Sequence, residues 1–200
     1  MSHYYLNDES LAHDTNILEV TVKDVSMRLY TDKGVFSKGG LDFGTRVLLE
    51  TIELHEGIKT VIDMGSGYGP ISINLAKRYP FINVYAYDVN ERAIDLTKKN
   101  IEENKTFNVE AQVSFLFEHV DHKADVVVTN PPIRAGKKTV FDLYEGAYAA
   151  LNHQGILYVV IQKKQGAPSS LEKIKSLFGN CEVIERKGGY WILFAQKIEK

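Results

Sequence analysis

The chain has 200 residues, of which 44% are hydrophobic and 25% are charged, and its formal net charge is −2. This composition is ordinary for a soluble globular protein, and the length suits one domain with a large core. The small net charge argues against a polybasic tail, although a local basic patch would be enough to bind nucleic acid. The single cysteine, Cys181, excludes an intrachain disulfide and a cysteine-based zinc cluster.

The N-terminus is polar and has no signal-peptide core, and no apolar run in the sequence approaches the length of a membrane span. His119 and His122 lie close together, but no third ligand accompanies them, so we expect no metal site. These observations predict a cytoplasmic protein that contacts no membrane.

The N-terminal fifth of the chain differs from the rest. Residues 17–31 alternate apolar and polar side chains on both sides of Lys23 and Asp24, which predicts a β-hairpin. The glycine-rich residues 32–44 predict a loop, and the apolar spacing after Asp42 predicts a helix.

Strand-like and helix-like segments alternate through the remainder of the chain. The predicted strands are 60–64, 82–88, 109–117, 124–130 and 155–162, followed by a hairpin over 181–197 that turns at Gly188 and Gly189. The predicted helices after the first are 69–80, 90–104, 139–151 and 169–179. This alternation predicts an α/β fold with a doubly wound, mostly parallel seven-stranded sheet, an antiparallel C-terminal hairpin and an N-terminal β-hairpin extension. We predict a single domain over residues 1–200, in which 1–41 form the hairpin and a loop and 42–200 form the core.

The loop after the first core strand reads Asp63-Met64-Gly65-Ser66-Gly67-Tyr68-Gly69-Pro70. In doubly wound sheets ligands bind beyond the carboxyl ends of the strands, and glycines let a ligand approach the backbone closely. Asp88 ends the next strand about twenty residues later, where an acidic side chain can bind a ribose diol. The structural alternatives are a tight turn without a ligand, and a pair, Asp88 and Asn90, that only caps the following helix, for which Asn90 is the expected N-cap.

The spacing of these glycines departs from the dinucleotide pattern. The dinucleotide fingerprint requires G-x-G-x-x-G, whereas this loop is G-x-G-x-G and Pro70 stands near the position of the third glycine. The Asp63 carboxylate would repel a pyrophosphate but would tolerate a cationic ligand such as S-adenosylmethionine.

A run of β-branched residues leads into Asn130, Pro131 and Pro132. A plain Asn-Pro turn that closes a strand is one interpretation. In the other, the Asn130 side-chain oxygen and the Pro131 carbonyl form a rigid pair of hydrogen-bond acceptors. Such a pair would orient a planar amine and stabilise the positive charge that develops as it is alkylated.

The segments "VIDMGSGYGP", "AYDVN" and "VVVTNPPIRAGK", in this order, resemble class I S-adenosylmethionine-dependent methyltransferases. The Asn-Pro-Pro element marks the branch that methylates amino or amide nitrogens on planar groups. "GVFSKGGLDFGTRVLL" resembles the small-domain family of ribosomal RNA guanine-N2 methyltransferases in its compact single-domain form. The resemblance extends from about His3 to Lys197 and implies a Rossmann-like methyltransferase fold.

The resemblance also implies the site residues. The cofactor would be S-adenosylmethionine, bound by Asp63, Gly65, Ser66, Gly67, Gly69, Asp88, Val89, Phe115 and Asn130, and by a covering segment with Phe36, Ser37, Lys38, Asp42, Gly44 and Thr45. The catalytic segment would be Asn130, Pro131, Pro132 and Ile133. An ordinary loop that caps a helix through Asp42 or Thr45 is the alternative for the covering segment.

Two positions depart from the pattern of this branch. Ile133 stands where an aromatic residue usually stacks on the target base, so stacking must come from elsewhere or be replaced by apolar contact. Tyr190 and Trp191 are expected to be core strand residues. Phe115 stands where an acidic or amide residue often meets the adenine amine, which predicts an apolar adenine wall with polar contacts from Ser114 or the backbone.

Basic residues follow two of the predicted strands and are candidates for RNA contact: Arg134, Lys137, Lys138, Lys163 and Lys164. Scattered surface lysines are the alternative interpretation. The resulting hypothesis is methylation of a guanine N2 amine in small-subunit ribosomal RNA, with ribosomal RNA or the small subunit as partner and a monomer or weak homodimer as the acting form. Three alternatives stay open: a protein glutamine-amide methyltransferase, an inactive cofactor- or RNA-binding module, and a nicotinamide dehydrogenase.

Overall fold

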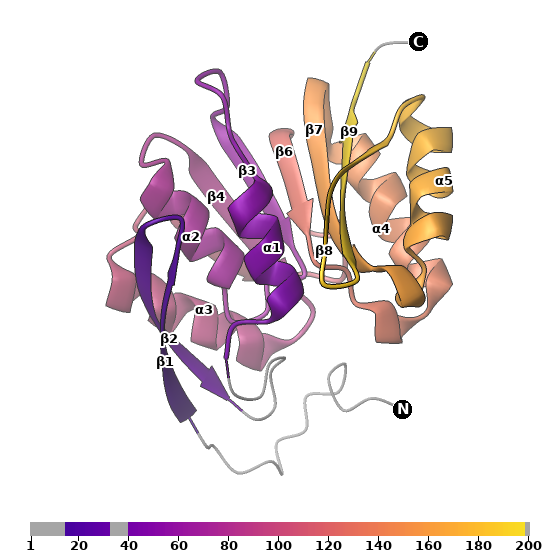
Figure 1. Cartoon of the computed structure of the whole chain (residues 1–200). Coiled ribbons are helices and arrows are strands. Elements are labelled where there is room, and N and C mark those ends of the chain that lie inside the picture. The colour runs from indigo at the N-terminus through magenta and orange to yellow at the C-terminus, as the bar shows by residue number, and fades with distance from the viewer. Residues whose placement is uncertain (1–14, 33–39, 199–200) are drawn as a thin grey trace.

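A computed structural model describes residues 15–32 and 40–198 and consists of one large sheet, a separate hairpin and flanking helices (Figure 1). The large sheet has the order β5-β4-β3-β6-β7-β9-β8, in which β9 alone runs antiparallel to its neighbours. Its strands are β3 (Thr60–Met64), β4 (Asn83–Asp88), β5 (Val109–Val113), β6 (Ala124–Thr129), β7 (Leu151–Gln162), β8 (Glu182–Lys187) and β9 (Tyr190–Gln196). This arrangement confirms the predicted doubly wound sheet and its closing antiparallel hairpin.

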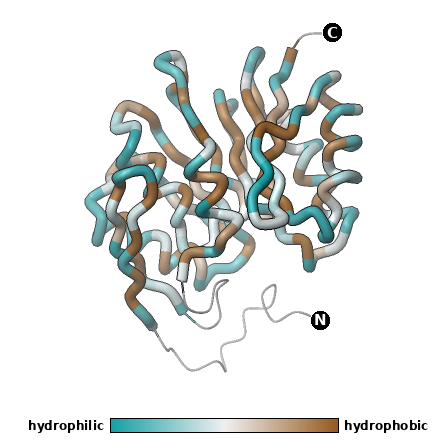
Figure 2. The backbone as a smooth tube through the Cα atoms, in the orientation of Figure 1, coloured by the Kyte–Doolittle hydropathy of each residue, from teal (hydrophilic) through white to brown (hydrophobic). Residues whose placement is uncertain are grey.

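The helices cover the sheet from both faces. They are α1 (Phe43–Thr51), α2 (Pro70–Arg78), α3 (Glu91–Asn104), α4 (Lys137–Ala150) and α5 (Ala167–Phe178), with short 3₁₀ turns η2 (Ile133–Ala135) and η3 (Lys163–Gln165). Helices α1 to α3 enclose one apolar core against the sheet, and α4 and α5 enclose a second core on the opposite face. Hydrophobic residues follow the central strands, as Figure 2 shows, because these strands are covered on both faces. In the described part of the chain no helix is long and apolar enough to cross a membrane.

The third core strand is shorter than the sequence pattern predicts. The prediction extended this strand to residue 117, but β5 ends at Val113. The Ser114 hydroxyl bonds the Leu116 carbonyl at 2.8 Å and the His119 N–H at 3.2 Å, and these bonds turn the chain away from the sheet. The prediction of strand over residues 114–117 was therefore wrong.

Other element boundaries differ by a few residues. Strand β7 begins at Leu151 rather than at residue 155, and α4 and α5 each begin two residues before the predicted start. Helix ends are weakly specified by periodicity alone, so shifts of this size are expected.

The predicted N-terminal hairpin is present as β1 (Thr15–Val22) and β2 (Val25–Asp32). Its two turn residues, Lys23 and Asp24, have φ values of 49° and 62°, which match the twist that a two-residue hairpin turn requires. The hairpin buries Val22, Met27 and Leu29 in the core that α1 to α3 enclose, and β2 packs against α2 and α3.

Two asparagines of α3 fasten the hairpin to the rest of the molecule. The Asn100 amide accepts from the Tyr30 N–H at 2.6 Å and donates to the Tyr30 carbonyl at 3.0 Å. Its second amide hydrogen bonds the Tyr68 carbonyl at 2.8 Å, in the glycine-rich loop. Asn104 makes the same two-way contact with the Arg28 backbone. Each amide thus bonds both the N–H and the carbonyl of one residue of β2, as the backbone of a neighbouring strand would. Asn100 also joins the hairpin to the loop after β3.

We expect Asn100→Ala to lower the free energy of unfolding by about 2–4 kcal/mol. The change removes the hydrogen-bond partner of the Tyr30 N–H, the Tyr30 carbonyl and the Tyr68 carbonyl at once. Urea denaturation of the purified variant measures this change. Asn104→Ala is the matched control, and its cost should be smaller because Asn104 is only half-buried and its contacts with Arg28 are exposed. Equal costs for the two variants would contradict a special role for the Asn100 bridge.

Candidate functional site

The carboxyl ends of three adjacent strands meet at one edge of the sheet, which is the lower edge in Figure 1. Met64 of β3 pairs with Tyr87 of β4 on one side and with Thr129 of β6 on the other. The loops that follow these strands therefore begin at the same level. This register brings together the glycine-rich loop, Asp88 and Asn130, which are far apart in the sequence.

The glycine-rich loop is held rigidly by hydrogen bonds from its surroundings. The N–H groups of Gly65 and Ser66 both donate to the Tyr87 carbonyl, at 2.8 and 3.0 Å. The Gly67 N–H donates to the Asp88 carboxylate at 2.8 Å, and the Thr97 hydroxyl donates to the Gly67 carbonyl at 2.8 Å. These bonds fix the path of the loop.

Gly69 shows why a glycine is needed at the end of this loop. It has a φ of +87° and caps α2, and a Cβ atom at this position would lie 2.9 Å from the Thr97 side chain. Both the left-handed backbone and the close approach of α3 exclude larger residues. Pro70 follows at the first helical position, where its fixed φ suits the start of a helix.

Asp63 and Ser66 carry buried polar atoms that lack partners. The Asp63 carboxylate is fully buried, and its Oδ2 accepts from the Ser72 N–H at 3.1 Å and the Ser72 hydroxyl at 2.6 Å. Its Oδ1 and the Ser66 Oγ have no hydrogen-bond partner within the described residues. Buried polar groups are rarely left unpaired, so these two atoms, at the carboxyl end of β3 and in the loop that follows, are available to a polar ligand.

Burial raises the pKa of Asp63 to about 7, and the nearby Asp88 carboxylate adds to this rise, while the bonds from Ser72 oppose it. A cationic group beside Oδ1 would favour the ionised form and would remove part of the cost of burial. The chemistry of this position therefore favours a ligand with positive charge over one with a pyrophosphate.

Asp88, Val89 and Asn90 form the turn after β4. The Asp88 carboxylate accepts from the Gly67 N–H and, at 2.9 Å, from the Asn90 N–H. The Asn90 side chain caps α3 by accepting from the Ala93 N–H, and Val89 is half-buried between these two polar residues. The predicted cap at Asn90 is confirmed, and Asp88 supports this turn through the Asn90 N–H while it also connects the turn to the glycine-rich loop through Gly67.

Asn130 lies beside the glycine-rich loop. A Cβ atom added to Gly65 would be 3.9 Å from the Asn130 carbonyl oxygen. The Asn130 amide nitrogen donates to Asp42 Oδ2 at 3.1 Å and to the Thr45 hydroxyl at 3.0 Å. The Pro131 carbonyl accepts from the Ile133 N–H at 2.8 Å, which closes a tight turn over Pro132.

The covering segment is described only in part. Phe36, Ser37 and Lys38 lie outside the described residues. Asp42 caps α1 by accepting from the Thr45 N–H at 2.9 Å, so the capping alternative is observed together with the contact to Asn130. Gly44 is buried beneath Tyr190, whose ring would lie 2.6 Å from an added Cβ atom, and this contact accounts for the glycine.

Phe115 is the second residue after β5 and is 45% exposed at the same edge of the sheet. The Ser114 N–H donates to the Asp88 carbonyl at 2.9 Å, so Phe115 stands next to the turn after β4. The Ser114 hydroxyl is buried and is used in the turn of its own loop. It is therefore not placed to supply the polar contact that the sequence suggested.

An aromatic pair near Asn130 was missed by the sequence analysis. Phe43, the first residue of α1, is 44% exposed, and its ring centroid lies 5.9 Å from that of Tyr190. Tyr190 begins β9, is half-buried and packs against the core that α1 to α3 enclose. No local pattern connects these residues, because the sheet brings the start of β9 against the start of α1.

The five basic candidates are placed at the carboxyl edge of β6 and β7. Arg134, Lys163 and Lys164 are exposed in η2 and η3. Lys137 and Lys138 begin α4, where Lys138 pairs with Asp142 at 2.6 Å and Lys137 lies over the Phe141 ring. Because β6 and β7 are parallel neighbours, the two groups follow adjacent strand ends.

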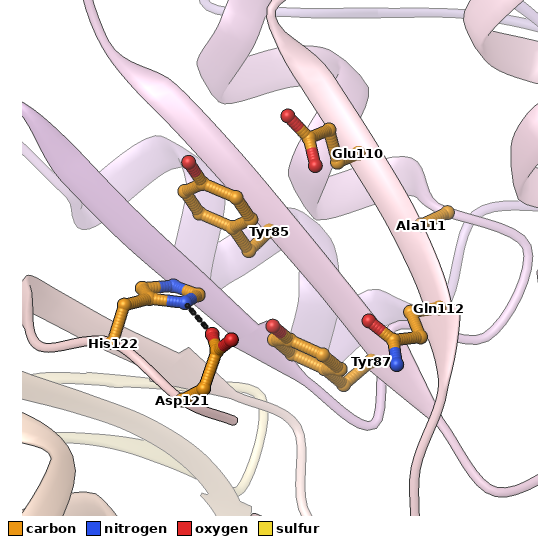
Figure 3. Close-up of a pocket in the computed structure, with 7 residues that line it drawn as sticks. All are labelled: Tyr85, Tyr87, Glu110, Ala111, Gln112, Asp121 and His122. Atoms are coloured by element: carbon orange, nitrogen blue, oxygen red, sulfur yellow. Dashed lines mark hydrogen bonds and ion pairs between the residues drawn. The ribbon is translucent and has the colours of Figure 1, made fainter. Parts of the chain in front are cut away.

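A cavity of about 340 Å³ lies on the opposite face of the sheet from Asp63 and Asp88 (Figure 3). Tyr85, Tyr87, Glu110 and Gln112 line it from β4 and β5, and Asp121 and His122 close it from the loop after β5. The described residues hold no cluster of three or more side chains that could bind a metal ion. This cavity is separate from the site at the strand ends.

The raised pKa of Asp63 predicts a pH dependence of stability. Folding favours the protonated carboxyl, so the folded protein binds more protons than the unfolded chain between the ordinary value of 3.8 and about 7. The stability of the ligand-free protein, measured relative to Asp63→Asn, should therefore fall as the pH rises through this window, by up to roughly 4 kcal/mol, and should level off above it. Urea denaturation of both proteins measures the difference. Asp95→Asn, an exposed change on α3, is the control, and its free energy of unfolding should depend on pH as that of the wild type does. A difference between the wild type and Asp63→Asn that does not change with pH would contradict the raised pKa of Asp63.

Comparisons with known proteins agree with this geometry. Residues 26–194 match the sequence model of the methyltransferase small domain. The chain is 40% identical over 198 residues, 98% of both chains, to the Bacillus subtilis protein YbxB, whose function is uncharacterized. It is 34% identical over 163 residues to the Escherichia coli ribosomal RNA small subunit methyltransferase C. This alignment covers 78% of the present chain and 46% of that relative.

A solved structure shows the same fold. The T. thermophilus 16S rRNA N2 methyltransferase RsmC, solved in complex with AdoMet and guanosine, superposes with a TM-score of 0.80 at 23% sequence identity. The alignment covers 94% of this chain and 51% of that chain. The chain thus spans about half the length of the ribosomal RNA methyltransferases that it matches. On the family match over most of its length, the chain belongs to the methyltransferase small domain family.

Proposed function

We propose that the protein transfers a methyl group from S-adenosylmethionine to the exocyclic N2 amine of a guanine in small-subunit ribosomal RNA. The observation that carries the proposal is the position of Asn130 and Pro131 directly beside the glycine-rich loop. A pair of acceptors at the edge of a cofactor loop is the arrangement that transfer to a planar amine requires.

The residues around the loop fit S-adenosylmethionine. The unpaired Asp63 Oδ1 and Ser66 Oγ offer polar contacts to the charged methionine end. Asp88, at the end of β4, would bind the ribose, and the exposed ring of Phe115 would offer an apolar surface to the adenine. When bound, this cofactor supplies an electrophilic methyl group on a sulfonium.

Asn130 and Pro131 would hold the target amine. Its lone pair is delocalised into the base, so it is a weak nucleophile that gains from exact alignment with the methyl carbon. The Asn130 Oδ1 and the second lone pair of the Pro131 carbonyl would accept its two N–H groups and stabilise the charge that forms on the nitrogen. Transfer would form a C–N bond in place of the C–S bond of the cofactor, and the nitrogen would then release one proton to solvent.

The surroundings support an RNA substrate over a protein amide. Exposed Arg134, Lys163 and Lys164 lie at the same edge and could contact phosphates. Phe43 and Tyr190 offer an aromatic surface near Asn130 that could replace the stacking partner absent at Ile133. The ribosomal RNA relatives favour the same choice. Action in the cytoplasm, as a monomer or weak homodimer, is part of the proposal.

The direct test uses S-adenosylmethionine labelled on its methyl group. The protein is incubated with small ribosomal subunits from cells that lack its activity, and the product is separated into RNA and protein. Label in N2-methylguanosine supports the proposal. Label confined to protein glutamine would replace RNA by a protein amide as the substrate, and absence of label with intact cofactor binding would favour a binding module.

Asn130→Ala should lower kcat by about 10²–10³-fold, because its oxygen would align the target amine, and should leave the Kd for S-adenosylmethionine within a few-fold of the wild type, because the other cofactor-binding residues are unchanged. Single-turnover methylation and isothermal titration calorimetry measure the two quantities. Turnover that matches the wild type would show that Asn130 is not catalytic.

The double change of Lys163 and Lys164 to alanine should raise KM for the RNA substrate several-fold with kcat unchanged, since these groups would only position the RNA. It should also reduce the slope of log affinity against log salt by about 1–2. Lys59→Ala, an exposed change at the opposite edge of the sheet, is the control. An unchanged salt slope would indicate that these two lysines do not contact phosphate.

A further inference from the structure

Asn130 is held by two side chains of the segment that begins α1. Its amide nitrogen donates to Asp42 Oδ2 at 3.1 Å and to the Thr45 hydroxyl at 3.0 Å. Within the described residues no hydrogen bond reaches the Asn130 Oδ1. The amide therefore has one end fixed and one end open.

We propose that Asp42 is a positioning residue, which determines that the oxygen of the Asn130 amide, and not its nitrogen, faces the target amine. This inference rests on the proposed function and assigns a task to a residue that the resemblance placed only in the cofactor-covering segment. Thr45 assists by fixing the second amide hydrogen.

The chemistry of the carboxylate sets the orientation. A carboxylate only accepts hydrogen bonds, so an amide 3.1 Å away must turn its N–H₂ group toward it. The Thr45 hydroxyl can donate or accept and would tolerate either end of the amide. Asp42 is consequently the group that separates the two orientations.

The Asp42 carboxylate is itself fixed in place. The same Oδ2 accepts from the Thr45 N–H at 2.9 Å, as the N-cap of α1. Thr45 is 4% exposed, and Gly44 beside it packs under Tyr190, so the first turn of the helix has little freedom. The helix start thereby transmits its position to Asn130.

The orientation matters because the target amine presents N–H groups. An amide turned the wrong way would direct its own N–H₂ toward them, and two donors repel. The acceptor pair of Asn130 and Pro131 would then lose one member, although every residue of the motif would still be present.

The first test is Asp42→Asn. Asparagine caps helices as well as aspartate does, but its oxygen carries no charge, and its N–H₂ group can turn toward Asn130 when the bond from the Thr45 N–H is given up. We expect kcat to fall by about tenfold, because part of the population holds the wrong amide orientation and the remainder is held less firmly. The Kd for S-adenosylmethionine and the melting temperature should change little, and the exposed Asp95→Asn change should leave kcat as in the wild type.

The second test exchanges the two partners. Asn130→Asp alone places two carboxylates together and should be strongly impaired. Adding Asp42→Asn removes one of the two charges and allows the N–H₂ group at position 42 to donate to the acceptor at 130, in place of the cap bond from the Thr45 N–H, and both oxygens of the new carboxylate are acceptors. The double variant should therefore recover kcat by about tenfold over Asn130→Asp, which a role in capping or cofactor binding alone would not produce.

Other results would overturn the inference. A raised Kd for S-adenosylmethionine with unchanged kcat in Asp42→Asn would assign Asp42 to cofactor binding. Unchanged kcat and Kd together would leave Asp42 as a helix cap only. Failure of the double variant to exceed Asn130→Asp would contradict the donor–acceptor pairing.

A measurement without substrate separates this inference from the proposed function. The side-chain NH₂ resonances of Asn130 are identified in ¹⁵N–¹H spectra by their absence from Asn130→Ala. Hydrogen exchange of these protons should be slow in the wild type and faster in Asp42→Ser, which retains a helix cap but loses the carboxylate. Equal exchange in both would overturn the orienting role, whichever substrate the enzyme methylates, and absence of RNA methylation would count against the proposed function alone.

Discussion

The parallel register of β3 with β4 and β6 is the constraint on which the site depends. Met64 lies between Tyr87 and Thr129, so three loops leave the sheet at one level. A slip of one residue would reverse the faces of a whole strand and would move Asp63 into the core of α4 and α5. The apolar side chains of both cores therefore fix the alignment, and the chemistry follows from it.

Two polar groups at this edge lower the stability of the protein when they have no partner. Asp63 is fully buried with one oxygen unpaired, and Ser66 has an unpaired hydroxyl close by in the same loop. Unpaired buried groups lower stability, and functional sites commonly retain such costs because binding removes them. The rigid bonding of the loop backbone through Gly67 and Thr97 keeps these groups in place without the ligand.

The sequence predicted the parts of the molecule that local patterns encode. Short-range signals in the sequence predict the alternation of strands and helices and the N-terminal hairpin that turns at Lys23 and Asp24. They also predict that Asp63 and Asn130 lie at the carboxyl ends of strands. The contacts that complete the site could not be predicted in this way. Asn130 bonds Asp42, which is 88 positions away in the sequence. The Ser114 hydroxyl ends β5 early through hydrogen bonds that the apolar periodicity of the sequence does not predict.

The hairpin extension shows how such long-range contacts connect the periphery to the chemistry. Asn100 bonds the Tyr30 backbone, 70 positions away, and also the Tyr68 carbonyl inside the glycine-rich loop. At the end of the hairpin, Asp32 forms an ion pair with Arg92, in the first turn of the helix that follows Asp88. The two contacts attach the hairpin to α3, the helix whose Thr97 and Asn100 side chains bond the backbone of the glycine-rich loop. Loss of the hairpin would therefore remove hydrogen-bond support from the Gly67–Gly69 region as well as apolar burial from the core of α1 to α3.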